Sequence, residues 1–159
     1  MAVFLSSFVN KVDKKGRVSV PASFRSVLGD GAPGIVVFRS LHVDALDACS
    51  IAHLELLSES LEKLDLAPDM FELIETTIFG GSVQVPFDGE GRIVLPPALA
   101  GAVGIAEEVA FVGRHKTFQL WNPAKLAAHD AKARSEARAK DISLSKIISA
   151  VTQTAGGGV

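Results

Sequence analysis

Hydrophobic and polar positions follow one pattern that occurs twice along the chain. A polar turn of the form Asp-x-x-Gly comes first. It is followed by a short run rich in β-branched residues, and a proline ends that run. Asp can bond its own backbone two residues on, and Gly adopts positive φ at no steric cost, so both segments predict tight turns. The runs Arg17–Val20 and Arg92–Leu95 then predict strands. Short helices are expected over Ala22–Leu28 and Pro97–Val103, each opened by proline and closed by glycine.

The two copies are related by a shift of 75 residues. Between Val3 and Arg39, nine of 37 positions hold the same residue in both copies, and most other matches keep apolar character. Two copies are too few for a solenoid. We therefore expect a pseudo-twofold unit in which each half completes the other.

Further elements follow the repeated segments. Strands are predicted over Ile35–Phe38 and Val109–Val112, and Thr117–Trp121 alternates polar and apolar residues as a half-buried strand does. Between the copies, Ser50 is a candidate N-cap for a helix with an apolar stripe, and Pro68 opens a second helix. The stripe consists of Ile51, Leu54, Leu57, Leu61 and Leu64.

After Trp121, Asn122 and Pro123 open a third helix, rich in Ala, Lys and Arg, that ends at about Lys140. The glycines near the C-terminus predict a frayed end. These elements divide the chain into a first repeat (1–49), a helical insert (50–79), a second repeat (80–121), a C-terminal helical segment (122–147) and a flexible tail (148–159).

Composition narrows the class of protein. The chain has 159 residues, of which 48% are hydrophobic and 21% charged, and these are ordinary globular values. Cys49 is the one cysteine, so an intrachain disulfide is excluded and a reducing compartment is favoured. No run of about 18 apolar residues predicts a membrane span, and the N-terminus lacks the pattern of a secretory signal. We therefore expect a soluble cytoplasmic protein.

Charge is segregated along the chain, although the net charge is only −2. Residues 10–39 carry a net charge of +4, residues 43–79 carry −8, and residues 114–146 carry +5. A segregated pattern of this kind says more about possible partners than the total does.

No arrangement of residues indicates an enzyme. The four histidines share no metal-ligand spacing, and no nucleophile elbow, Walker loop or dinucleotide-binding motif is present. Asp13 and Asp88 could be imagined as paired catalytic carboxylates, but their role in the turns explains both more simply. We expect neither a cofactor nor a metal.

Cations gather in the first copy of the repeat. Long cations on an exposed rigid turn suit phosphate contacts, and Arg can also bond guanine in bidentate fashion. A solvated surface is the alternative reading, but Gly89, Glu90 and Ala100 replace three of these cations in the second copy, and this asymmetry favours binding. The predicted DNA-binding residues are Lys14, Lys15, Arg17 and Arg25. The predicted turn-forming residues are Asp13, Gly16, Asp88, Gly91 and Arg92.

The repeated motif resembles that of a known family. Two copies of D-x-x-G-R-[VI]-x-[VL]-P at this spacing are similar to the MraZ family of bacterial transcriptional regulators. The stretch Val112–Trp121 is similar to that family's V-G-x-x-x-x-F-x-L-W segment. One copy of the motif alone would indicate only the wider AbrB-like group.

The resemblance implies an α+β fold, an internally duplicated swapped-hairpin (AbrB/MraZ-like) β-barrel with peripheral helices. It implies a ring-shaped homo-oligomer, an octamer or a dodecamer, that binds repeated promoter boxes in double-stranded DNA upstream of the division and cell-wall gene cluster, usually as a repressor. Such a protein would be associated with the nucleoid and not with the membrane. The family's DNA-contacting D-x-K-G-R segment matches Asp13–Arg17, so Lys15 and Arg17 carry over. Arg25 matches the basic residue after the short helix in AbrB-like proteins.

Two functions from different classes remain open. The first is a DNA-binding regulator. The second is a non-DNA assembly or antitoxin-like module on the same barrel, whose acidic insert engages a protein partner. A gel-shift with DNA from upstream of the protein's own gene would discriminate between them.

Overall fold

The computed structural model describes residues 2–156 and divides the chain into two compact units. The first unit extends to Lys125 and the second begins at Leu126. The elements in chain order are β1 (Ser7–Lys11), β2 (Arg17–Ser19), α1 (Ala22–Leu28), β3 (Gly34–Arg39), β4 (Leu46–Cys49), α2 (Ile51–Glu62), α3 (Pro68–Ile74), the π-helix η1 (Glu75–Phe79), β5 (Val83–Pro86), β6 (Arg92–Val94), α4 (Pro97–Ala102), β7 (Glu108–Arg114), β8 (Thr117–Trp121), α5 (Pro123–Ala139) and α6 (Leu144–Gly156).

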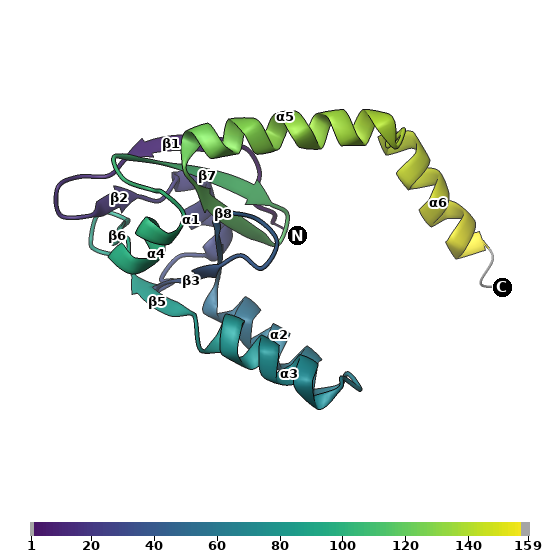
Figure 1. Cartoon of the computed structure of the whole chain (residues 1–159), viewed down its shortest axis with the longest axis horizontal. Coiled ribbons are helices and arrows are strands. Elements are labelled where there is room, and N and C mark those ends of the chain that lie inside the picture. The colour runs from purple at the N-terminus through teal and green to yellow at the C-terminus, as the bar shows by residue number, and fades with distance from the viewer. Residues whose placement is uncertain (1, 157–159) are drawn as a thin grey trace. The chain divides into compact units, whose positions relative to one another are not determined.

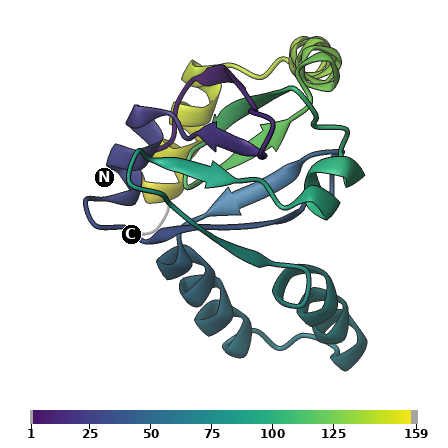
Figure 2. The ribbon, with the colours of Figure 1, turned by 90° about the vertical axis from the view of Figure 1, so that its left-hand side faces the viewer.

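The strands of the first unit form a six-stranded antiparallel sheet and a separate two-stranded ribbon (Figures 1 and 2). The order in the large sheet is β1-β7-β8-β4-β3-β5, and β2 pairs with β6 in the ribbon. The fold is therefore α+β, as predicted, and it consists of the antiparallel sheet, the ribbon and surrounding helices.

The pairing exchanges strands between the two copies of the repeat. β1 of the first copy pairs with β7 of the second, with Val9 opposite Ala110. β5 of the second copy pairs with β3 of the first, with Val85 opposite Ile35. The ribbon also joins one strand from each copy. The prediction that each half completes the other is confirmed.

Sheet and ribbon share one hydrophobic core. Val18 of β2 and Ile93 of β6 are each 1% exposed and belong to the same cluster as the inner face of the large sheet. Phe24 of α1 lies at the centre, with its ring centroid 5.4 Å from that of Phe4 and 5.0 Å from that of Phe118. This shared core holds the ribbon, and the turns before its strands, in one position.

The half-buried character predicted for β8 is wrong. Four of its five residues are buried, including Gln119 at 6% exposure. The Gln119 amide Nε2 donates to Asp47 Oδ1 at 2.8 Å, and its Oε1 accepts from Arg114 Nη1 at 3.1 Å. A polar residue at an alternating position is thus buried because neighbouring side chains satisfy its hydrogen bonds.

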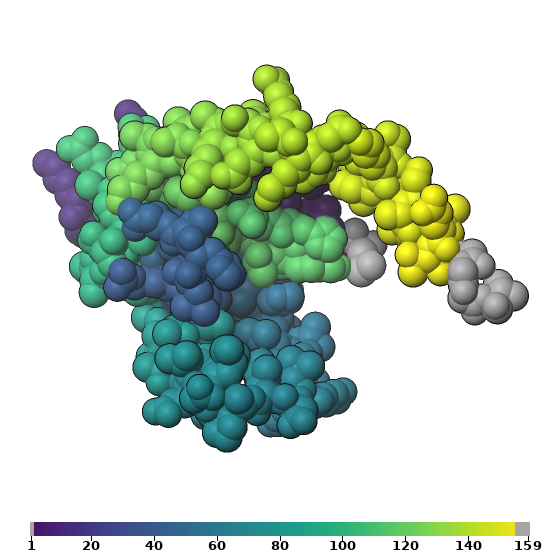
Figure 3. Space-filling view, turned by 45° about the vertical axis from the view of Figure 1, so that its right-hand side comes forward, coloured from purple at the N-terminus to yellow at the C-terminus, as the bar shows by residue number. Residues whose placement is uncertain are grey.

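The insert contains two α-helices where two were expected, but α2 ends at Glu62, so Leu64 of the predicted apolar stripe lies beyond it, and a π-helix follows α3. Ser50 caps α2, because its hydroxyl accepts a hydrogen bond from the backbone N–H of His53 at 3.0 Å, and Pro68 opens α3. α2 and α3 project from the body of the first unit, as Figures 1 and 2 show, and in Figure 3 they form the blue to teal part at the bottom.

The C-terminal segment differs in part from the prediction. α5 matches the expected helix, but much of the predicted flexible tail (148–159) belongs to α6, and residues 157–159 lie outside the described residues. The hydroxyl of Ser143 accepts from the backbone N–H of Lys146, and apolar residues recur along one side of α6, so this segment has the signals of a helix. None of the described helices has the length and apolar character needed to cross a membrane.

Candidate nucleic-acid interface

The first turn is built around the side chain of Asp13. Its Oδ1 accepts hydrogen bonds from the backbone N–H groups of Lys15 at 2.9 Å and Arg17 at 2.8 Å. Its Oδ2 accepts from Arg17 Nε at 2.7 Å. Gly16 has φ +81° and donates its N–H to the Asp13 carbonyl at 3.0 Å. The turn is therefore rigid, because Asp13 and Arg17, the first and last residues of the motif, are bonded to each other.

The second turn repeats this geometry. Asp88 Oδ1 accepts from the backbone N–H groups of Glu90 and Arg92, both at 2.9 Å, and Oδ2 accepts from Arg92 Nε at 2.7 Å. Gly91 has φ +74°. The two turns thus have the same set of side-chain hydrogen bonds. The structure also gives Arg17 the same turn-bracing ion pair as Arg92, which the sequence assignment did not anticipate.

The ionisation of the two aspartates follows from these bonds. The hydrogen bond from the backbone N–H of Arg17 lowers the pKa of the Asp13 carboxyl, and burial only partly opposes it. The hydrogen bond from the backbone N–H of Arg92 lowers the pKa of Asp88 in the same way. Both carboxylates therefore stay charged, acceptor-only groups that brace the turns, and neither is suited to act as a general acid.

The ribbon brings the two turns onto one face of the first unit. In the β2–β6 register, Arg17 lies opposite Val94 and Ser19 lies opposite Arg92. Directly opposed residues project from the same side of a ribbon, and Val18 and Ile93 project from the other side into the core. Strand spacings place the Cα atoms of Arg17 and Arg92 about 8 Å apart. We call residues 13–19 and 88–94 the paired-turn face.

Arg25 belongs to the second turn in space, although it follows the first turn in sequence. Its Nε donates to the carbonyl of Val20 at 3.1 Å. A Cβ built on Gly91 would lie 2.6 Å from Arg25 Nη1, so the guanidinium covers that glycine. The matching residue of the second copy, Ala100, lines a depression together with Lys14 and other residues of the first turn. The structure therefore brings Lys14, Lys15 and Arg17 together and places Arg25 at the other turn.

The turns share one geometry but differ in charge. The first turn (13–17) carries a net charge of +2, and the second (88–92) carries −1. Lys14 and Lys15 are exposed, and their side chains have no ion pair within residues 2–156. In the second turn, Glu90 Oε2 lies 3.7 Å from Arg92 Nη2, so the exposed acid partly neutralises the arginine. The paired-turn face thus has exposed lysines at the first turn only, and Arg25 lies beside the second turn.

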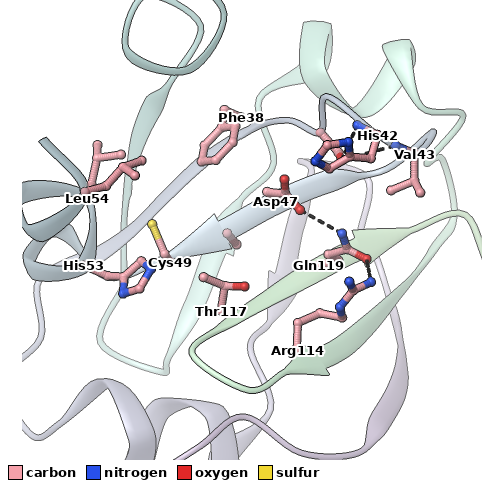
Figure 4. A pocket seen from close by; sticks show the side chains of 13 residues that line it. Phe38, His42, Val43, Asp47, Cys49, His53, Leu54, Arg114, Thr117 and Gln119 are labelled. Atoms are coloured by element: carbon pink, nitrogen blue, oxygen red, sulfur yellow. Dashed lines mark hydrogen bonds between the residues drawn. The ribbon is translucent and has the colours of Figure 1, made fainter. Parts of the chain in front are cut away.

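A cavity of about 310 Å³ lies on the side of the large sheet that faces away from the ribbon (Figure 4). Its lining differs in chemistry from the paired-turn face. Asp47, Gln119 and Arg114 form the hydrogen-bonded chain described above, and Cys49 and His53 line the cavity farther along, towards α2. Burial, followed by the charge of Asp47, raises the pKa of the Cys49 thiol to about 11. Cys49 is therefore a protonated, buried thiol and a poor nucleophile.

None of the predicted site residues lines this cavity. Within residues 2–156, no group of three or more His, Cys, Asp or Glu side chains is arranged to hold a metal ion. The polar chain was missed at the sequence level because Asp47 and Gln119 are 72 positions apart and belong to no motif. The two turns are therefore the candidate site, because the sequence motifs mark them and the structure places them on one face.

Comparisons with known proteins agree with the repeated motif. A family model described as "MraZ protein, putative antitoxin-like" matches residues 78–144. A protein of Rickettsia bellii named "Transcriptional regulator MraZ" is 43% identical over 146 residues, covering 91% of this chain and 97% of the relative. Proteins of the same name from Rickettsia felis and Rickettsia akari are 42% and 41% identical over 145 residues, with the same coverage.

Proposed function

The chain belongs to the MraZ family, and on that premise we propose that it is a DNA-binding transcriptional regulator. In finer detail, we propose that it represses its own division and cell-wall gene cluster, binding repeated promoter boxes as a closed homo-oligomeric ring. Its place would then be the cytoplasm, on the nucleoid, and its activity would be binding rather than catalysis. The observation that supports the proposal most is the paired-turn face, where a rigid, cation-bearing turn lies on the same ribbon as its duplicate.

Each cation of the first turn has a chemistry suited to DNA. Lys14 and Lys15 are exposed point charges, which suit phosphate oxygens and sequence-independent attraction. Arg17 is held by Asp13 through Nε, which leaves its two terminal amino groups for a bidentate contact with a guanine edge. The carboxylate thus fixes the direction of the guanidinium before DNA arrives, and this reduces the entropy lost on binding.

Assembly would supply the affinity that one chain lacks. Few cations on a single turn give weak binding, but several linked copies raise the effective concentration of each contact. A ring that presents identical faces suits a promoter with identical boxes. Light scattering at micromolar protomer concentration is expected to return a mass larger than that of a tetramer, and a monomer mass would refute this part of the proposal.

A gel-shift with DNA from upstream of the protein's own gene, at two salt concentrations, tests the proposal directly. We expect binding to this DNA, stronger than to random DNA of equal length, and weaker at the higher salt. Binding to neither DNA would refute the DNA-binding role and favour the alternative of a protein-interaction module.

Arg17→Ala and Arg92→Ala are matched variants, because both remove the same ion pair at 2.7 Å from turns of the same geometry. We expect both to have similar effects on thermal unfolding. Arg17→Ala alone is expected to reduce the preference for operator over random DNA, by about 1–3 kcal/mol for each lost bidentate contact. Equal loss of DNA preference in both variants would refute the assignment of base reading to the first turn.

The salt dependence of binding measures the phosphate contacts. The logarithm of the binding constant falls by about 0.9 per neutralised phosphate for each tenfold rise in salt. Lys15→Ala is expected to reduce this slope by roughly one for each engaged copy, on every DNA sequence. Glu90→Lys is expected to steepen it, because the ribbon places the second turn on the same face. An unchanged slope with Glu90→Lys would show that the second turn lies away from the DNA.

A further inference from the structure

The insert helices leave apolar side chains exposed on the first unit. Leu56 and Leu64 are each 57% exposed, Met70 is 50% exposed, and Leu73 on α3 is 61% exposed. Residues 51–79 also carry seven acids and one base, a net charge of −6. The surface of α2 and α3 is therefore both apolar and strongly negative, and we call it the acidic insert surface.

The second unit has the complementary properties. On α6, apolar residues recur at spacings of three and four, which places them on one side of the helix. All of them are at least half exposed: Leu144, Ile147, Ile148 and Val151. Residues 126–156 carry five bases and three acids, a net charge of +2. A helix of 13 residues is marginal by itself in water, so α6 gains stability from any surface that covers its apolar side.

Charged groups without partners lie on both surfaces. Glu55, Glu59 and Glu62 project from α2 at spacings that place them along one side, and none of them has an ion pair among the described residues. Arg138 and Lys140, at the end of α5 and just beyond it, are also exposed and lack ion pairs within residues 2–156. By contrast, Arg134 on α5 is already held by Asp130 at 2.8 Å.

We propose that the second unit of one copy docks on the acidic insert surface of another copy of the same chain. The apolar side of α6 would cover the exposed leucines and methionine, and Arg138 and Lys140 would lie against the glutamates of α2. The inference rests on the closed homo-oligomer proposed above and names the surfaces that would join its subunits.

Charge decides which surfaces pair. Contact between two acidic insert surfaces would oppose −6 to −6, and contact between two second units would oppose +2 to +2. Of these three pairings, the contact of an acidic insert surface with a second unit is the one that brings opposite charges together and covers apolar residues on both partners. Such a contact is heterologous, so each copy offers one surface to its neighbour on each side, and the chain of contacts closes into a ring when the rotation between copies fits.

Two charge-reversed variants of the full chain test the contact. The acid-reversed variant carries Glu55→Lys, Glu59→Lys and Glu62→Lys, and the base-reversed variant carries Arg138→Glu and Lys140→Glu. Lys, Arg and Glu are all good helix formers, so the helices are retained. Each variant alone is expected to need at least a tenfold higher protomer concentration than the wild type to reach half-assembly, measured by sedimentation or light scattering.

An equimolar mixture of the two variants is the decisive measurement. Where the two variants alternate, each junction joins either two native surfaces or two oppositely reversed ones, so assembly is expected to return towards the wild-type concentration. Recovery also shows that both variants are folded. Variants that assemble like the wild type, or a mixture that stays dissociated, would overturn the contact and indicate docking within one chain or a different partner on this surface. A monomeric wild type would refute the oligomer itself, whereas an oligomeric wild type with unaffected variants refutes only this contact.

Discussion

Replacing Gly91 and Gly16 by alanine tests whether Arg25 occupies the second turn. Both glycines have left-handed backbones, with φ +74° and +81°. An L-residue there costs about 1–2 kcal/mol of stability. At Gly16, an added Cβ would meet Val94 Cγ1 at 3.6 Å, an ordinary van der Waals contact, so Gly16→Ala is expected to show the backbone strain alone.

At Gly91 the same strain comes with a displaced side chain. The added Cβ would lie 2.6 Å from Arg25 Nη1 and 2.8 Å from its Nε, so the guanidinium must move. Its Nε would then lose the hydrogen bond to the Val20 carbonyl, which is partly buried, at a further cost of about 0.5–1.5 kcal/mol. Gly91→Ala is therefore expected to destabilise the chain by about 1.5–3.5 kcal/mol in all.

Thermal unfolding at one fixed protomer concentration measures the difference, because oligomerisation makes the midpoint concentration-dependent. A chain of this length loses about 2–4 °C in Tm per kcal/mol, so Gly16→Ala should lower the Tm by about 2–8 °C and Gly91→Ala by about 1–6 °C more. In an Arg25→Ala background the extra loss at Gly91 should vanish, because the displaced group is gone. Equal losses in the two single variants, or an extra loss that persists without Arg25, would refute the placement of Arg25.

Three further expectations follow from the core and from ionisable groups. Phe24→Ala should cost about 3–5 kcal/mol in urea unfolding, because it empties the centre of the aromatic cluster, and a loss below 1 kcal/mol would contradict that role. The lowered pKa values of Asp13 and Asp88 mean that the folded chain binds fewer protons than the unfolded chain near their ordinary value of 3.8. Stability should therefore be retained above that value and lost as pH falls below it, and urea titrations between about pH 5 and pH 3 should show a smaller acid loss in Asp13→Asn/Asp88→Asn. Cys49, with a pKa near 11 and 3% exposure, should react with iodoacetamide at about pH 8 much more slowly than it does in urea, and equal rates would contradict its burial.

Local signals in the sequence predicted the elements whose structure is local. The turns, α1, the Ser50 cap and the strand at Thr117–Trp121 all lie where proline, glycine, aspartate and periodicity place them. β1 and β5 were missed, since most of their residues are exposed and their alternation is weak. They are strands because each pairs with a strand of the other copy, and no local pattern reports such a partner.

Hydrogen bonds between side chains far apart in the sequence could not be predicted from local patterns either. Gln119 reads as a solvent-facing residue, yet it is buried because Asp47 and Arg114 complete its hydrogen bonds. In the same way, the linear position of Arg25 after the first turn suggested one cation cluster. The exchange of strands carries α1 across to the second turn, and a neighbour in sequence becomes a neighbour of the other copy.

This exchange changes what the asymmetry between the copies means. Each turn is formed by one copy and flanked by the short helix of the other, so Ala100 lies beside the first turn and Arg25 beside the second. The lysines of the first turn therefore stand without a flanking arginine, and the turn that carries Glu90 has Arg25 next to it. The second copy has no cation at Gly89, Glu90 or Ala100. Because Ala100 lies at the first turn and Gly89 and Glu90 lie in the second, positive charge is missing at both ends of the paired-turn face. Among the described residues on and beside this face, the cations without an ion pair come from the first copy at both ends: exposed lysines at one end, and Arg25, which donates to the Val20 carbonyl, at the other. If the chain binds DNA as proposed above, the first turn would supply attraction to phosphate, and Arg25 would offset the net charge of −1 on the second turn, so that this turn could lie near the same DNA.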